Sequence, residues 1–246
     1  MKANYSELQF TYSIVRELED MGAWSEGPFF PTQRQEAHLG YDVRFVNDFV
    51  ALFIQFKRSE MLMQSNAGQW GDFRRNYLRF DIYPNNRSHQ HNNLVQLAQR
   101  NVRNRVYYCA PLFVELDELM EYHRVHTVCE YSVVVDCCTL PTIGGSDEHC
   151  ICYANDPLRG YMYSEPKEIK IETVKEVYKN LRKSEYTYSN FDEFMENMLK
   201  LFTEEKLFCE SSGVKDLNDF KENFNDYFKS YLYYMGLNFV VVKNSD

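Results

Sequence analysis

The sequence predicts an α/β fold, in which a mixed sheet carries helices on its faces. Apolar side chains recur at helical spacing within residues 5–21, and two short apolar runs of strand length follow at 41–46 and 50–57. Another helical pattern, at about 89–102, leads into an apolar run at 105–110. A helix that returns the chain to a further strand favours a sheet with both parallel and antiparallel pairs.

Length and composition are those of a folded protein. Of the 246 residues, 44% are hydrophobic and 16% are aromatic, which is enough to build a sizeable core. No apolar run approaches the roughly 20 residues of a membrane-spanning helix, and residues 1–7 lack the apolar stretch of a signal peptide. We therefore expect a cytoplasmic protein without membrane contact. The seven cysteines are expected to be reduced, buried thiols.

The first predicted elements are a helix and two strands. Leu8, Tyr12 and Leu18 mark the apolar face of the helix, and Gly22 ends it. The following segment holds glycine and proline and is predicted to be a loop. Two strands then come at about 41–46 and 50–57, joined by a short polar turn.

A third strand and a second helix are predicted next. Residues 59–76 are polar and contain glycine, which is typical of an insertion or a mobile loop. Residues 77–83 alternate in polarity and stop at Pro84, as a strand does. The helix at about 89–102 and the strand at 105–110 complete the order α-β-β-β-α-β, in which the three strands are expected to form a meander.

The remaining chain has weaker patterns. A helix is predicted at 116–122, and strands are predicted at 131–136 and 149–154. Residues 165–235 are predicted to be largely helical, and 237–242 to form a last strand.

Three polar residues stand out among the apolar strands. Asp42 lies at the start of one strand, and Gln55 and Lys57 lie two positions apart in the next, so their side chains share one face. A lysine after the apolar run Leu52–Phe56 is costly to bury unless its charge meets a partner. The alternative is structural, because lysines at strand ends protect against aggregation and an aspartate after a glycine turn is ordinary.

Asp42, Gln55 and Lys57, in this order of elements, resemble the PD-(D/E)XK phosphodiesterase superfamily, the restriction-endonuclease-like nucleases. The likeness is to the Mrr-like variant, in which glutamine replaces the second acid, and it covers about residues 5–113. It implies a restriction-endonuclease-like α-β-β-β-α-β core with a largely helical C-terminal extension. It also implies a Mg²⁺-dependent endodeoxyribonuclease, with Mn²⁺ as a substitute, that hydrolyses phosphodiester bonds in DNA during restriction or phage defence.

The resemblance implies a role for each residue of the motif. Asp42 is the expected principal metal ligand, and Gln55 is expected to ligate weakly or to orient a ligand water. The main-chain carbonyl of Phe56 is expected to supply another oxygen. Lys57 is expected to orient the attacking water or to stabilise the transition state.

A further carboxylate is expected, because glutamine in place of an acid removes one negative charge from the metal site. The resemblance places it on the first helix, where Glu7 lies in the first turn, and Glu36 is the alternative. Each also has an ordinary explanation. Glu7 is an acid near a helix N-terminus, where negative charge is favourable, and Glu36 is a solvated loop charge.

Charge is distributed unevenly along a chain whose formal net charge is −9. Residues 74–105 hold seven arginines and one acid, whereas residues 115–156 hold nine acids and one arginine. The basic window favours a local phosphate-binding face, and the alternative is a set of solvated surface arginines. The candidates for nucleic-acid contacts are Arg58, Arg74, Arg75, Arg79, Arg100 and Arg103.

Residues 1–160 are predicted to form the catalytic domain and residues 161–246 a helical C-terminal subdomain, with one undivided domain as the alternative. DNA is the expected partner, with a homodimer and a specificity-providing partner protein as further expectations. The rival hypothesis is a catalytically inactive nuclease-fold module that binds nucleic acid or a partner protein, and a third is an inhibitor that mimics nucleic acid. A zinc site near His126, Cys129 or Cys150 is a weaker alternative, because no pair of Cys-x2-Cys segments is present.

Overall fold

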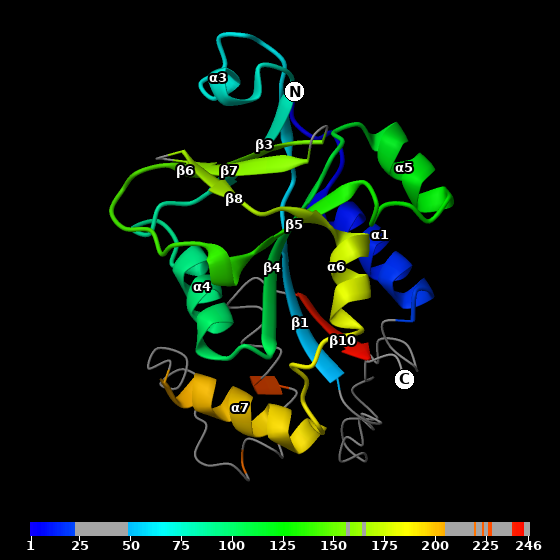
Figure 1. Cartoon of the computed structure of the whole chain (residues 1–246), viewed down its shortest axis with the longest axis vertical. Helices are drawn as coiled ribbons and strands as arrows, with labels where there is room; N and C mark the ends of the chain where they lie inside the picture. Colours follow the sequence, from blue (N-terminus) through cyan, green and yellow to red (C-terminus); the bar gives the residue numbers. More distant parts are fainter. Residues whose placement is uncertain are drawn as a thin grey trace.

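The protein is an α/β structure built around two sheets (Figure 1). The computed structural model describes residues 1–22, 49–155, 158–163, 166–204, 219, 223, 226–227 and 238–243. The strand expected at 41–46, with Asp42, lies outside these residues, and so does Glu36. No helix among the described residues is long and apolar enough to cross a membrane.

The first sheet is mixed, as the sequence predicts. Its strand order is β10-β1-β4-β5-β9. β1 pairs in parallel with β4 and antiparallel with β10, and β4 pairs antiparallel with β5. The strands are β1 (Phe49–Phe56), β4 (Asn104–Pro111), β5 (Ser132–Asp136), β9 (Glu172–Thr173) and β10 (Asn238–Lys243).

The second sheet is antiparallel throughout its described pairs, in the order β2-β3-β6-β7-β8. Its strands are β2 (Glu60–Leu62), β3 (Tyr77–Ile82), β6 (His149–Ala154), β7 (Arg159–Tyr163) and β8 (Lys167–Ile169). One face of β3, carrying Leu78, Phe80 and Ile82, belongs to the main core. On the other face, Tyr77 packs in a smaller cluster with Phe73.

Helices lie on both sides of the first sheet. In Figure 1, α4 lies on one side of β1 and β4, α1 and α6 lie on the other, and α7 lies at the end remote from the second sheet. The helices are α1 (Glu7–Asp20), α3 (Trp70–Phe73), α4 (Gln90–Arg100), α5 (Leu116–Arg124), α6 (Val174–Leu181) and α7 (Phe191–Glu204), with a 3₁₀ turn, η1 (Cys137–Thr139).

The buried face of α1 agrees only in part with the predicted one, which is confirmed at Leu18. Leu8 and Tyr12 are 77% and 61% exposed, whereas Phe10 and Ile14 are fully buried. Phe10 meets the ring of Phe56 edge-on, with 5.7 Å between the ring centroids. Both sets of residues have helical spacing, so periodicity alone did not identify the face that meets the sheet.

The predicted three-strand meander is also wrong for its third strand. β3 does not extend the first sheet but pairs with β2 and β6 in the second. Every residue of β1 is buried, and its described partners, β4 and β10, come from distant segments. The stretch 59–76, expected to be a loop or an insertion, contributes β2 and α3.

The second half of the chain shares these sheets. The expected domain boundary after residue 160 falls inside β7. The segment expected to be helical from residue 165 begins with β8 and β9, and only then forms α6 and α7. The last strand, β10, is an edge partner of β1 in the first sheet.

Candidate active site

The candidate site lies where β1 ends beside the first turns of α1 and α4. Lys57 follows the last residue of β1 and extends the ladder, because its backbone N–H donates to the Cys109 carbonyl at 2.9 Å. Gln55 and Lys57 both reach Gln90, the first residue of α4. The predicted common face of Gln55 and Lys57 is therefore the face that α4 covers.

Three hydrogen bonds join these residues in one direction. The Lys57 ammonium donates to Gln90 Oε1 at 3.4 Å, Gln90 Nε2 donates to Gln55 Oε1 at 2.9 Å, and Gln55 Nε2 donates to the Phe56 carbonyl at 3.1 Å. We call this arrangement the amide chain. The amide chain begins at Lys57 and ends at its neighbour Phe56, and Gln90 of α4 connects Lys57 to Gln55.

Lys57 is a half-buried cation in mixed surroundings. Its ammonium lies 5.8 Å from the centroid of the Tyr108 ring, a cation–π contact. Burial lowers the pKa of Lys57, and the nearby acidic groups Glu7, Asp81 and Cys137 offset part of that effect. The lysine therefore gives up its proton more readily than a solvated lysine does.

Glu7 lies at the first position of α1, beside Lys57 and Arg58. Its side chain is exposed and accepts no hydrogen bond from any residue that the structure describes. Partial burial raises the pKa of Glu7, while the positive charges of Lys57 and Arg58 lower it by a smaller amount. Glu7 and Lys57 do not form a direct ion pair in the described structure, so the carboxylate is open to a cation or a water molecule.

The first turn of α4 is held in place by its own side chains. His91 is buried and contacts the Tyr108 hydroxyl at 3.1 Å through Nδ1 and the Pro141 carbonyl at 2.9 Å through Nε2. Asn92 exchanges two hydrogen bonds, both of 2.8 Å, with the backbone of Ile143. Burial lowers the pKa of His91. His91 therefore helps to hold α4 in position and is not exposed at the site.

The expected metal ligands are only partly present among the described residues. Asp42 and Glu36 are not described. The oxygens expected from Gln55 and Phe56 each accept a hydrogen bond within the amide chain, and because a carbonyl oxygen has two lone pairs, their role as metal ligands stays a prediction. Of the carboxylates expected to bind the metal, Glu7 is the one that the structure describes. No cluster of three or more His, Cys, Asp and Glu side chains that could hold a metal ion occurs in the described part of the chain.

The arginines of the basic window do not form one face. Arg79 pairs with Glu60 at 2.7 Å across β2 and β3. Arg103 pairs with Glu193 of α7 and lies over the ring of Tyr188. It precedes the first residue of β4, whereas Lys57 lies near the last residues of that strand. These two arginines pair with acids of neighbouring elements, which neutralise part of their charge, and their expected contact with nucleic acid stays a prediction.

The other candidate arginines are widely separated. Arg74 and Arg75 follow α3, a helix that Figure 1 shows beyond the second sheet, and Arg100 ends α4. Arg58 alone among the six candidates adjoins Lys57 in the chain, and its guanidinium donates to the Tyr5 carbonyl at 3.4 Å. Fewer of these positive charges therefore lie near the site than their spacing in the sequence suggests.

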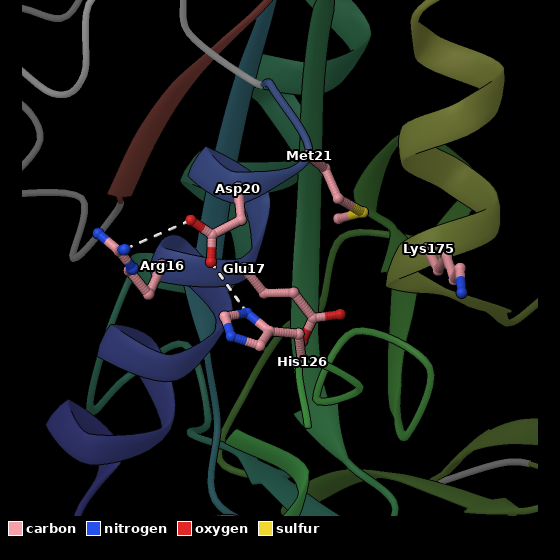
Figure 2. Close-up of a pocket in the computed structure, with 6 residues that line it drawn as sticks. All are labelled: Arg16, Glu17, Asp20, Met21, His126 and Lys175. Atoms are coloured by element: carbon pink, nitrogen blue, oxygen red, sulfur yellow. Dashed lines mark ion pairs between the residues drawn. The ribbon is translucent and has the colours of Figure 1, made fainter. Parts of the chain in front are cut away.

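A separate open pocket of about 440 Å³ lies between α1, α6 and the loop after α5 (Figure 2). Its lining residues are Arg16, Glu17, Asp20, Met21, His126 and Lys175. Figure 2 shows Asp20 between Arg16 and His126, at 3.5 Å and 2.9 Å. His126 pairs with Asp20 and is exposed, whereas Cys129 is buried, and no metal-binding group of three or more side chains includes either residue in the part of the chain that the structure describes.

Sequence reasoning identified the side chains on β1 but missed their partner. Gln90 lies 33 residues after Lys57, within a polar stretch whose local pattern does not indicate a contact with Lys57. Comparison with known proteins adds nothing to this geometry, because no family model, no curated protein and no solved structure matches the chain.

Proposed function

We propose that this chain is a metal-dependent nuclease that hydrolyses phosphodiester bonds in DNA. The observation that carries the proposal is the juxtaposition of Lys57 and Glu7 at the end of β1. The ammonium is half-buried, the carboxylate is exposed, and their charges lie near enough for each to shift the pKa of the other. These are the two kinds of group that phosphodiester hydrolysis requires beside a divalent ion.

Each residue has a defined task in this mechanism. Mg²⁺ would be held by Glu7, together with Asp42 from outside the described residues, and when bound it neutralises phosphate charge and activates water. The Lys57 ammonium would donate to a nonbridging phosphate oxygen, whose negative charge grows as the water attacks. Arg58 would contact the neighbouring phosphate. The amide chain would keep the ammonium at a fixed position throughout.

The resemblance to PD-(D/E)XK nucleases supports the choice of DNA and of a role in restriction or phage defence. The parallel pair of β1 and β4, with α4 directly before β4 in the chain, supports the proposal at the level of a mixed sheet with helices on its faces. Recognition of a particular sequence or modification is proposed to depend on a second copy of the chain or on a partner protein. Because this proposal leaves the recognised sequence or modification open, cleavage is to be tested on several substrates.

The test is a cleavage assay with supercoiled plasmid, linear duplex, methylated duplex and single-stranded DNA. Wild-type protein is expected to cut at least one of them with Mg²⁺ or Mn²⁺ and none with a chelator. Lys57→Ala is expected to lose about 100- to 1,000-fold in rate, as for other groups that stabilise a developing negative charge. Glu7→Gln is expected to lose activity that raised Mg²⁺ partly restores.

The matched control is Lys167→Ala, which removes an exposed lysine on β8 and should leave the rate unchanged. Circular dichroism spectra of all variants must agree, so that lost activity is not lost folding. Cleavage by Lys57→Ala at the wild-type rate would contradict the proposal, because no other described residue supplies this cation.

The rate is expected to depend on pH with two limbs. Glu7 must be ionised, so the rate falls as pH drops through its pKa, which lies above the ordinary value of 4.5. Lys57 must be protonated, so the rate also falls as pH rises through its pKa, which lies below the ordinary value of 10.5. Lys57→Arg should move the alkaline limb upward, because a guanidinium stays charged.

A binding module without catalysis is the second candidate. The observation in its favour is that the oxygens of Gln55 and Phe56 each accept a hydrogen bond from within the protein, which lowers their availability to a metal. Such a module would bind DNA with an affinity that falls as salt rises and would cleave no substrate with any divalent metal. Lys57→Ala would then weaken binding, whereas in a nuclease it would mainly lower kcat.

A further inference from the structure

We propose that Gln90 is a positioning residue that orients the Lys57 ammonium. The inference rests on the proposed function and extends it to a residue of α4. Two hydrogen bonds carry it: Gln90 Oε1 accepts from the Lys57 ammonium, and Gln90 Nε2 donates to Gln55 Oε1.

The direction of the amide chain leaves Gln90 one orientation. The Phe56 carbonyl can only accept, so the Gln55 amide nitrogen must point to it and the Gln55 oxygen must point away. That oxygen takes the Gln90 nitrogen, which turns the Gln90 oxygen toward Lys57. An ammonium has donors only, so the contact of Lys57 with Gln90 is consistent with the protonated lysine.

The position of Gln90 is fixed by residues that touch neither Lys57 nor Gln55. The backbone N–H of Gln90 donates to Ser88 Oγ at 3.3 Å, and the next two residues bind the 141–143 segment. A side chain on a helix held in this way loses little freedom when it binds the lysine, so it can define the ammonium position closely.

Other charged groups also change the pKa of Lys57, so the contribution of Gln90 is compared with theirs. Glu7 on α1, Asp81 on β3 and Cys137 in η1 favour the charged lysine. Buried His91 on α4 opposes it when protonated. Of these elements, α4 alone supplies a side-chain hydrogen bond to the Lys57 ammonium within the described structure, so Gln90 acts at contact distance where the others act through space.

The test compares Gln90→Met with Gln90→Glu. Methionine has similar length and lacks the amide oxygen, so the Lys57 pKa should fall by about one unit, the order expected for one hydrogen bond to a charged group. Glutamate puts a carboxylate against the ammonium, so the Lys57 pKa should rise. NMR of protein with ¹³C-labelled lysine, assigned with Lys57→Arg, measures both shifts.

Cleavage kinetics give the second readout. For Gln90→Met, the alkaline limb of kcat should move to lower pH, and kcat at pH 8 should fall about tenfold while KM stays within about twofold. Gln90→Glu should move that limb to higher pH. The control is Gln96→Met, an exposed glutamine on the same helix, which should change neither the Lys57 titration nor kcat.

Identical Lys57 titrations in wild-type protein and Gln90→Met would overturn the inference. So would equal shifts in the same direction for the methionine and glutamate variants, which would indicate a general disturbance of α4. The proposed function fails separately, by absence of cleavage in wild-type protein, and in that case the NMR titration still decides whether Gln90 holds Lys57.

Discussion

Replacement of Glu17 should destabilise the protein in a way that depends on pH. Glu17 lies on α1 with 5% of its surface exposed, at the back of the pocket in Figure 2. Its Oε2 accepts the Cys129 N–H at 3.1 Å. The carboxylate therefore ties α1 to the turn before β5, far along the chain.

The size of the effect follows from what each variant removes. Glu17→Ala leaves the buried Cys129 N–H without its acceptor, which costs about 1–3 kcal/mol. It also removes one buried methylene, worth about 0.8 kcal/mol. Relief of the buried charge offsets part of both, so we expect a loss of about 2 kcal/mol in the free energy of unfolding. Glu17→Gln keeps an acceptor and should lose less than about 1 kcal/mol.

The pH dependence has a definite sign. Burial raises the pKa of Glu17 above its ordinary value of 4.5, although the backbone N–H groups of Cys129 and Val128 lower it in part. The folded state therefore holds this proton more tightly than the unfolded state. The contribution of Glu17 is greatest at low pH and declines as pH rises from about 4.5 through the folded pKa.

The assay is urea denaturation of wild-type protein and Glu17→Gln, followed by circular dichroism between pH 4 and pH 8. The amide that this variant introduces does not titrate, so the wild-type free energy of unfolding minus that of the variant should fall with rising pH and then level off. A difference that rises with pH would refute the reasoning, because it would mean that folding favours the ionised carboxylate.

Three further outcomes are expected. Cys138, the exposed cysteine among those described, should take up maleimide in the native protein before any other described cysteine, as measured by peptide mass mapping with Cys138→Ser as the control. Arg103→Ala should cost no more than about 1 kcal/mol, because the pair with Glu193 is partly exposed, and a tenfold loss of DNA affinity would show that this arginine binds substrate after all. Phe10→Ala should lower the unfolding free energy by about 3–5 kcal/mol in the same denaturation assay, because the ring is fully buried against Phe56.

The sequence predicts those elements whose local pattern decides their structure. The run at 50–57 is apolar at nearly every position, and it forms a strand buried along its whole length, Phe49–Phe56. The helix expected at 89–102 is α4, and the strand expected at 105–110 is β4. In each case period and length agree, so distant residues were not needed to identify the element.

Strand pairing is different, because it depends on residues far apart. The alternation of β3 shows that one of its faces is buried, but it does not show which sheet receives that face. β1 finds its antiparallel neighbour in β10, near the end of the sequence. The order of elements along the sequence therefore does not determine which strands pair.

The candidate site shows the same division. A separation of two residues along the strand was enough to predict that Gln55 and Lys57 share one face. The predicted start of the first helix was enough to place Glu7 in its first turn. The partner Gln90 required the packing of α4 on β1. The arginine window shows a related limit, because a count of charges along the chain does not include acids such as Glu193 that neutralise them in space.

The amide chain gives a physical reason for glutamine at position 55. This side chain must donate to the Phe56 carbonyl and accept from Gln90 at the same time, and an amide does both. An ionised glutamate could accept from Gln90, but it would set a negative charge against the Phe56 carbonyl in a site where Gln55 is 7% exposed. Gln55 is thus suited to its neighbours and does not require the loss of an ancestral acid as an explanation. On this argument Gln55→Glu should weaken the support of Lys57, even though it restores a carboxylate to the strand.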